Sequence, residues 1–286
     1  MTKCAEVQAL FAWRRAKTAP ACRPAARLSE RRGTVSGARG LFMREFVRST
    51  LRRWGWDLHR YLPTLAGDAQ LQHALRCFAV DLVLDVGANS GQFGTALRSL
   101  GYAGRILSFE PLADVHAALE RKCAGDPLWS AAPRGALGGE DGRITINIAG
   151  NSASSSVLPM LDSHSQAAPE SRYIGQEQVP IHRLDTLLPA MRGDARQIYL
   201  KIDTQGYERE VLAGATATLA DVAAVQLEVS LTPLYGGQAS FAEMLALMDG
   251  HGLVPWALWP GFAEPGTGRI LQADVIFGRP DRARRP

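Results

Sequence analysis

The stretch that decides the fold is VLDVGANSGQFG, Val83–Gly94. An apolar run ends at the acid Asp85, and Gly87, Gly91 and Gly94 follow within eight residues. A buried strand that turns tightly into a helix has this pattern, because glycine adopts loop conformations that other residues avoid. Ligands of open α/β sheets bind at the carboxyl ends of the strands. The stretch therefore predicts a ligand-binding loop.

The spacing of these glycines argues against a dinucleotide loop. They form G-x-x-x-G-x-x-G, whereas the dinucleotide loop needs G-x-G-x-x-G to seat a pyrophosphate on the helix N-terminus. Asp85 repels a phosphate but suits an amine or sulfonium cation. We expect the bare backbone at Gly87 to let a flat nucleoside approach closely, with Asn89 and Gly91 beside it.

Outward from this loop, strand-like and helix-like segments alternate, which predicts an α/β fold with a mostly parallel sheet and helices on both faces. The expected strands are residues 82–87, 105–111, 143–149, 197–203, 223–229, 253–259 and 271–278. The expected helices are residues 42–62, 69–80, 90–101, 113–125, 207–215 and 240–252. Residues 150–180 break the rhythm with polar runs and are expected to be a mobile lid or a surface loop.

The second strand ends at Glu110, 23 positions after Gly87, and Pro111 follows. An acid about twenty residues past the loop, at the next strand end, is placed to accept both hydroxyls of a ribose. The site therefore favours a ribose and a cation over a phosphate, and S-adenosylmethionine combines the two. The structural alternatives are a helix-capping role for Asp85 and a solvated strand end for Glu110.

The N-terminal segment differs in charge from the rest of the chain. Residues 1–60 hold 14 Lys and Arg against four acids, so their net charge is about +10, while the remainder carries about −6. We expect a basic, disordered arm at 1–42, a helical N-terminal cover at 43–79 and the main domain at 80–280. Three readings of the arm stay open: a start assigned too early, a basic arm that contacts membrane or nucleic acid, and a transit peptide.

Localisation is indicated by what the chain lacks. No apolar run approaches the ~18 residues needed to span a bilayer. The four cysteines show no zinc-like spacing, which favours free thiols in a reducing compartment. We therefore expect a cytoplasmic protein, with membrane association through the basic N-terminal segment as an open alternative and with no nucleic-acid partner.

At this point the sequence resembles the FkbM-type S-adenosylmethionine-dependent methyltransferases, over roughly residues 80–278. The most specific stretch is YLKIDTQGYEREVLAGA, Tyr199–Ala215, which carries the family's K-I-D-x-x-G-x-E-x-x-V-L-x-G core. Gln205 stands where the family usually has an acid. Further matches in family order are DVGANSGQFG, FEP, GALGGEDG, HRLDTLL, VQLEVSLTPLYGG and ADVIFGR.

The resemblance implies a class I methyltransferase fold: a seven-stranded, mostly parallel, Rossmann-like sheet with an antiparallel last strand. It also implies S-adenosylmethionine as the cofactor, and O-methylation of a hydroxyl on a sugar, glycolipid or polyketide-type secondary metabolite. It places the adenine near Ala136 and Leu137.

An alcohol is a poor nucleophile, so a base beside the acceptor hydroxyl is expected. Asp203 ends the strand 197–203 and is the first candidate, both as base and as cofactor contact. Glu228 ends the next strand and is the second candidate, and His182 is the third, because histidine is a common proton acceptor at neutral pH. The structural alternatives are a helix cap for Asp203, an ion pair for Glu228 and an ordinary strand histidine for His182. No His, Asp and Glu spacing indicates a metal site.

Aromatic residues near the C-terminus are candidates for the acceptor pocket. Trp256, Trp259 and Phe262 offer flat faces that pack on sugar rings, and Tyr235 is a rim candidate. One of the two tryptophans is expected to belong to the core. Two other functions stay open: a nicotinamide-dependent oxidoreductase on the same kind of sheet, and a non-catalytic methyltransferase-like scaffold.

Overall fold

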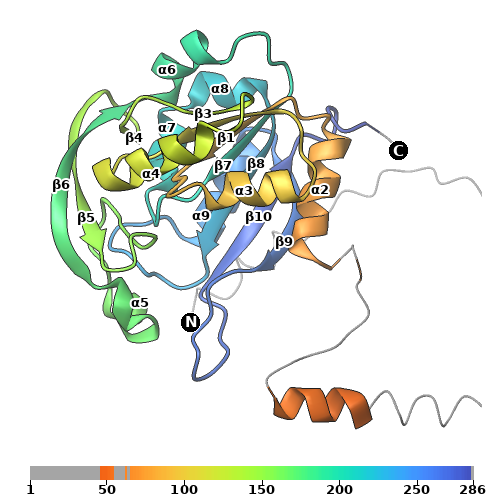
Figure 1. The fold of residues 1–286 in the computed structure, drawn as a ribbon, viewed down its shortest axis with the longest axis vertical. Helices are drawn as coiled ribbons and strands as arrows, with labels where there is room; N and C mark the ends of the chain where they lie inside the picture. The colour runs from red at the N-terminus through yellow and green to blue at the C-terminus, as the bar shows by residue number, and fades with distance from the viewer. Residues whose placement is uncertain (1–45, 55–61, 63–64, 285–286) are drawn as a thin grey trace, which may run out of the picture. The chain divides into compact units, whose positions relative to one another are not determined.

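The computed structural model describes residues 46–54, 62 and 65–284 (Figure 1). The predicted arm at 1–42 lies outside the described residues. The chain divides into two compact units, residues 1–60 and 61–286. In the first unit residues 46–53 are helical, inside the range expected for the N-terminal helix. None of the helices in the described part of the chain is long and apolar enough to cross a membrane.

The second unit is built on a seven-stranded sheet with the order β3-β2-β1-β7-β8-β10-β9. Its strands are β1 (Leu82–Val86), β2 (Arg105–Phe109), β3 (Trp129–Ala131), β7 (Ile198–Ile202), β8 (Val222–Ser230), β9 (Val254–Pro260) and β10 (Gln272–Gly278). Strand β10 is antiparallel to both of its neighbours, β8 and β9, and the pairings from β3 to β8 are parallel. This is the class I methyltransferase sheet that the resemblance predicts, so the predicted fold class is confirmed.

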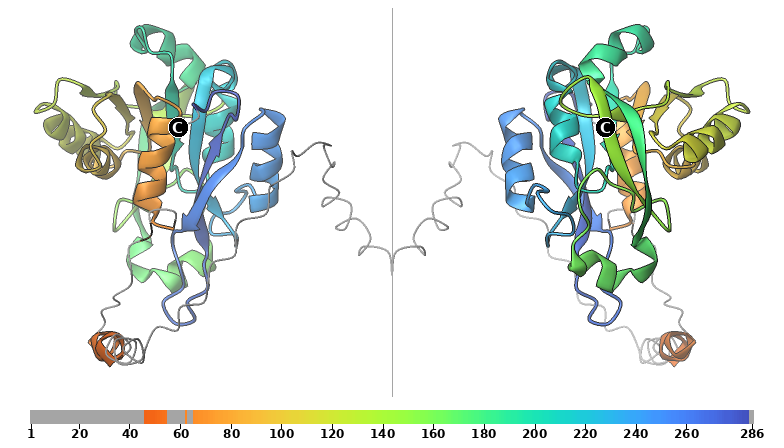
Figure 2. Two further views of the ribbon diagram at one scale, coloured as in Figure 1. Left: turned by 90° about the vertical axis from the view of Figure 1, so that its right-hand side faces the viewer. Right: turned by 90° about the vertical axis from the view of Figure 1, so that its left-hand side faces the viewer.

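Helices cover both faces of this sheet, as Figure 2 shows with the sheet seen edge-on. One face packs on α2 (Gly67–Cys77), α3 (Gln92–Ser99) and α4 (Ala113–Cys123). The other packs on α6 (Leu184–Met191), α7 (Glu208–Ala213), α8 (Thr216–Asp221) and α9 (Phe241–Gly250). Successive residues of each strand enter the two cores alternately, which is why β1, β7 and most of β8 are buried on both faces. The predicted helix at 69–80 is α2.

A second, three-stranded sheet corrects two expectations. It contains β4 (Ala136–Leu137), β5 (Gly142–Ala149) and β6 (Tyr173–His182), in the order β4-β6-β5. The expected strand at 143–149 therefore lies outside the main sheet. The short strand β3 takes its place in the main sheet. The polar segment 150–180 also holds α5 (Asp162–Ala167) and most of β6. The first half of β6 is largely exposed, so it lacks the apolar pattern of a buried strand.

Helix α3 lies close to β3, and this explains two of the three glycines. A Cβ at Gly94 would overlap the Trp129 ring, and one at Gly91 would lie 3.0 Å from the same ring. Gly91 also has φ +83° at the N-cap of α3, a conformation that favours glycine. Both glycines serve packing against Trp129.

Candidate functional site

A cavity of about 500 Å³ opens at the carboxyl edge of the main sheet, a size typical of sites for small molecules. It is bordered by the loops that follow β1, β2 and β7 and by the serine-rich stretch 152–157. Eight of the predicted site residues line it: Gly87, Asn89, Glu110, Pro111, Ala136, Leu137, Asp203 and Trp259.

The backbone N–H groups of the glycine loop are all engaged within the protein. Gly87 and Ala88 donate to the carbonyl of Phe109, Asn89 donates to Oε2 of Glu110, Ser90 donates to Oδ1 of Asn89, and Gly91 donates to the carbonyl of Ala88. A pyrophosphate needs such donors at the helix N-terminus. From Gly87 to Gly91 the loop has no N–H left to offer one.

Glu110 is the best-defined acid of the cavity. Its two oxygens accept the backbone N–H groups of Asn89, at 2.9 Å, and Leu112, at 3.0 Å. Burial raises the pKa of this carboxyl to about 7, although the two N–H donors oppose the rise. Each oxygen keeps a second lone pair, so Glu110 can still accept hydrogen bonds from a ligand.

Gly87 lines the cavity, but the reason for glycine there differs from the expectation. Its φ is +75°, and a Cβ would overlap the carbonyl oxygen of Asp203. The residue therefore allows the loops after β1 and β7 to lie against each other. Close approach of a ligand is not needed to explain it.

Asp85 is not among the residues that line the cavity, and its contact with the cofactor stays a prediction. It is fully buried below the cavity, where Oδ2 accepts a hydrogen bond from Ser108 at 3.1 Å. Oδ1 lies 3.5 Å from Nζ of Lys201. Burial raises the pKa of Asp85, and Lys201 opposes this rise. The residue holds Lys201 in place.

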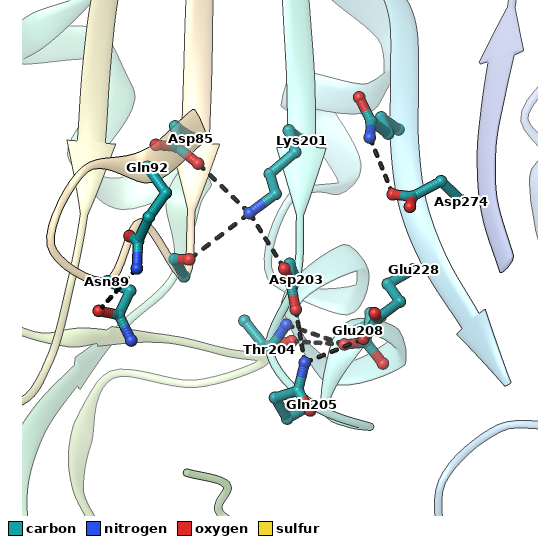
Figure 3. A network of polar contacts seen from close by, with 12 residues as sticks. Asp85, Asn89, Gln92, Lys201, Asp203, Thr204, Gln205, Glu208, Glu228 and Asp274 are labelled. Atoms are coloured by element: carbon teal, nitrogen blue, oxygen red, sulfur yellow. Dashed lines mark hydrogen bonds and ion pairs between the residues drawn. The ribbon is translucent and has the colours of Figure 1, made fainter. Parts of the chain in front are cut away.

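Lys201 contacts the end of β1 and both of the loops that follow β1 and β7 (Figure 3). Its Nζ lies 3.5 Å from Asp85, 3.3 Å from Asp203 and 3.5 Å from the carbonyl of Gly87. Burial alone would lower the pKa of this ammonium group, but the carboxylates of Asp203 and Asp85 outweigh burial and raise the pKa. Lys201 is therefore a cation, and it pairs with groups of the protein.

Asp203 lies in the cavity wall, where both of its oxygens are engaged. Oδ2 is 3.3 Å from Lys201, and Oδ1 accepts a hydrogen bond from Nε2 of Gln205 at 2.7 Å. The same Nε2 donates to Oε2 of Glu228 at 2.9 Å, as Figure 3 shows. One amide group thus bridges two carboxylates.

Two further acids support this loop from below. Glu208 accepts hydrogen bonds from the backbone N–H groups of Thr204, at 2.9 Å, and Gly206, at 3.1 Å, and so fixes the turn after Asp203. Burial raises the pKa of Glu208 to about 7. Burial, with Asp203 and Glu208 nearby, also raises the pKa of Glu228 well above its usual value. Glu228 is not among the residues that line the cavity, and its role as a base stays a prediction.

The remaining predicted site residues lie outside the lining of this cavity, and their roles stay predictions. His182 does not line the cavity; its Nδ1 lies 3.6 Å from Asp141. Tyr235 is 1% exposed and donates to Oε1 of Gln205, so it belongs to the core. Trp256 is exposed and packs edge-on against Phe78, at 5.0 Å between ring centroids.

Phe262 packs near His164 in a separate apolar cluster. Gly91 packs on Trp129 as described above and does not line the cavity. Within the described residues no group of three or more His, Cys, Asp or Glu side chains could hold a metal ion.

A family model described as "Methyltransferase FkbM domain" matches residues 85–254, more than half of the chain. The match contains the glycine loop, Glu110 and Asp203. The chain belongs to the FkbM methyltransferase family. S-adenosylmethionine is the methyl donor of this family and the cofactor of this chain. A comparison with curated protein sequences finds no significant match.

Several solved structures are similar to this FkbM domain at low sequence identity. TnmH is 15% identical, with 85% of this chain and 59% of TnmH covered and a TM-score of 0.37. The apo form of the S-adenosylmethionine-dependent methyltransferase SibL is 12% identical, with 86% and 60% covered and a TM-score of 0.39. An rRNA methylase from Streptococcus thermophilus is 9% identical, with 78% and 99% covered and a TM-score of 0.40.

The chain thus spans less than two thirds of TnmH and of SibL. These similarities are too distant to indicate a substrate.

The cavity of the FkbM domain fits this cofactor on chemical grounds. The carboxylates of Glu110, Asp203 and Asp274 face it, and its lysine is paired with Asp85 and Asp203. An excess of acids suits a sulfonium cation. Glu110 would hold the ribose hydroxyls, Asp203 would lie near the methionyl part, and the strand at Ala136 would border the adenine. Bound there, the cofactor supplies a methyl group.

Sequence reasoning missed several residues of the cavity. Asp274 and Gln226 lie in the middle of apolar strands, Lys201 stands two positions before Asp203 in its strand, and Phe93 and Leu71 belong to amphipathic helices. The available signal was a polar residue inside each of these otherwise apolar strands. Lys201 and Gln226 stand level with Asp85 in the sheet, and Asp274 stands two positions from that level. This signal becomes specific when the strand register is known.

Proposed function

We propose that this protein is an S-adenosylmethionine-dependent O-methyltransferase that methylates a hydroxyl of a sugar, glycolipid or polyketide-type secondary metabolite. The observation that carries the proposal is the combination of an acid-lined cavity with a glycine loop whose N–H groups are all engaged. Such a cavity favours a cationic nucleoside and disfavours a pyrophosphate.

Transfer of a methyl group to a hydroxyl depends mostly on placement. The acceptor oxygen must lie about 3 Å from the methyl carbon, opposite the sulfur, and water must be kept away. The walls of the cavity supply apolar surface for this purpose, among them Leu71, Phe93 and Trp259. A base that accepts the hydroxyl proton adds about 10²–10⁴-fold.

The two other functions considered have less support. A nicotinamide-dependent oxidoreductase requires a pyrophosphate-binding loop, and here the loop N–H groups from Gly87 to Gly91 are engaged within the protein. A non-catalytic scaffold does not require the acids of the cavity to be kept, whereas Glu110 and Asp203 both face it.

Isothermal titration calorimetry tests the cofactor part of this proposal. We expect S-adenosylhomocysteine to bind with measurable heat and NADH to give none. Heat from NADH together with none from S-adenosylhomocysteine would refute the proposal. The acceptor is then sought by mass spectrometry of extracts from cells with and without the gene, where the loss of the gene leaves a species lighter by one methylene.

The helix at residues 46–53 supports a proposal about partners. Phe46, Val47 and Trp54 are exposed among arginines, a composition typical of helices that lie on anionic membranes. We propose peripheral contact with such a membrane and no contact with nucleic acid. Co-sedimentation with phosphatidylserine vesicles tests this: binding should fall as salt is raised, and pure phosphatidylcholine vesicles should not bind the protein.

A further inference from the structure

The cavity continues past the region that the cofactor is expected to fill. Glu110 follows β2 and Asp203 follows β7, so a nucleoside held between them covers the β2, β1 and β7 ends. Beyond β7 the cavity is still lined by residues of α2, β8, β9 and β10: Asp68, Leu71, Gln226, Trp259 and Asp274. We call this region the distal half.

The register of the sheet brings the polar residues of the distal half together. Lys201 on β7 pairs with Gln226 on β8, and Asp274 on β10 pairs with Trp259 on β9. Asp274 is also directly opposite Glu228, two positions from Gln226, so all these side chains leave the same face of the sheet. Strands lie about 4.8 Å apart, so Asp274 is within about 10 Å of β7.

The carboxylate of Asp274 is held in a fixed orientation. The buried hydroxyl of Tyr199 donates to Oε1 of Gln226 at 2.8 Å, which turns the amide nitrogen of Gln226 outward. That nitrogen donates to Oδ1 of Asp274 at 2.9 Å. The carboxylate therefore acts as an acceptor toward a neutral amide.

Asp274 differs from Asp203 in what surrounds it. Both oxygens of Asp203 are engaged, one of them with the lysine cation. None of the ion pairs among the described residues includes Asp274. Burial and the nearby Asp203 carboxylate raise the pKa of Asp274, while the hydrogen bond from Gln226 and the Lys201 cation oppose the rise.

Trp259 provides a flat wall beside this carboxylate. Gly67, the first residue of α2, lies against the indole: a Cβ there would be 2.9 Å from its Cγ and Cδ2. The helix thus fixes the ring, and Leu71 completes the apolar lining. A carboxylate and an amide beside an indole face suit a ring that carries hydroxyl groups on its edge and C–H groups on its face.

We propose that the distal half binds the methyl acceptor as a hydroxylated sugar ring, and that Asp274 accepts the proton of the reacting hydroxyl. This inference rests on the proposed function. The hydroxyl O–H bond breaks and its proton passes to the Asp274 carboxylate. The oxygen forms its new bond to the methyl carbon, the carbon–sulfur bond breaks, and the bonding electrons stay on the sulfur of S-adenosylhomocysteine.

The test compares the wild-type protein with Asp274→Asn, Gly67→Ala and the exposed control Asp249→Asn. Calorimetry with S-adenosylhomocysteine checks that each protein is folded and that its cofactor-binding region is intact. We expect the affinities of all four proteins to agree within about twofold. Saturation-transfer NMR on the protein loaded with S-adenosylhomocysteine then measures binding of three probes: the methyl glycosides of glucose, galactose and mannose. We expect saturation transfer to at least one of the glycosides in the wild-type protein. This saturation transfer should be lost in Gly67→Ala, because the added Cβ forces the Trp259 indole to move.

Methyl transfer from S-adenosylmethionine to the bound glycoside is followed by mass. We expect Asp274→Asn to lower kcat by about 100-fold or more with little change in KM, because the amide cannot take the proton. Asp249→Asn should match the wild type.

The inference is overturned if Asp274→Asn transfers methyl groups at the wild-type rate, or if no glycoside receives saturation while S-adenosylhomocysteine is bound. Absence of S-adenosylhomocysteine binding in the wild type is a different result, since it refutes the proposed function itself.

Discussion

Gln205 is a small departure from the family pattern with a clear physical effect. Its amide nitrogen donates to both Asp203 and Glu228, and its oxygen accepts from Tyr235 at 2.9 Å. Its φ is +54°, a conformation that costs energy for any residue with a side chain. The bridge between two acids explains why this position holds an amide in the present chain.

Replacing Gln205 with Glu should destabilise the protein. The substitution removes two hydrogen bonds to carboxylates and adds a third carboxylate, at a cost of about 2–4 kcal/mol. The folded state would raise the pKa of the new acid. The loss of folding stability is therefore complete above that pKa, and it becomes smaller as pH falls below it. Thermal unfolding at about pH 8 and pH 5 measures this.

Added Mg²⁺ should restore part of the melting temperature of Gln205→Glu, because three carboxylates can share a cation. The exposed Gln178→Glu, beside Arg143, is the control and should melt like the wild type. Equal melting temperatures for Gln205→Glu and the wild type at both pH values would contradict the bridging role.

Glu110 should make cofactor binding depend on pH. Its pKa of about 7 is raised by burial, and the ionised form is the better acceptor for ribose hydroxyls and the better partner for a cation. Affinity for S-adenosylhomocysteine should therefore be about tenfold weaker at pH 6 than at pH 8, with a plateau above the pKa. Calorimetry across this range measures it.

The variant Glu110→Gln is the matched comparison for this titration. It should bind weakly and with an affinity that does not change between these pH values. A wild-type affinity that is flat with pH would mean that Glu110 is not the ribose acceptor.

At the scale of elements, α3 and β3 are fitted to each other through one tryptophan. Trp129 lies against Gly91 and Gly94, and its indole N–H donates to Ser108 at 3.0 Å. Ser108 in turn donates to Asp85, which pairs with Lys201. A series of polar contacts thus runs below the cavity, from the edge strand to the centre of the sheet. Gly91 and Gly94 keep Trp129, the first residue of this series, in place.

Gly94→Ala should destabilise the protein by about 1–2 kcal/mol. A Cβ would overlap the Trp129 ring, an overpacking cost of about 1–3 kcal/mol. The better helix propensity of alanine returns about 1 kcal/mol at most. Gly125→Ala is the control, because no atom lies within 4 Å of its added Cβ. Urea unfolding measures both, and a Gly94→Ala protein as stable as the control would contradict the packing argument.

At the scale of the whole molecule, the residues that form the cavity all come from the second unit. The earliest of them is Asp68, and the unit spans residues 61–286. We therefore expect a chain shortened to begin at Met43 to fold and to bind S-adenosylhomocysteine as the full chain does. Thermal unfolding and calorimetry on the two chains check this. A loss of folding would show that residues 1–42 support the domain.

The sequence by itself determined the class of fold and two of the strand ends that border the cavity. The alternation of apolar strands with helices predicts the parallel sheet, because each element must bury its apolar side. Asp203 and Glu110 were identified because each stands where a strand ends, a position that local pattern reveals. Glycine spacing argued against a pyrophosphate, and the engaged N–H groups of the loop support this.

The tertiary structure alone decided which acids face the cavity. Asp85 and Glu228 end or nearly end their strands as Asp203 does, yet neither lines it, because the depth of a side chain depends on what packs above it. Asp274 enters the site because β10 inserts antiparallel between β8 and β9. Strand order and register join residues far apart in the chain, and no local pattern encodes such long-range pairings.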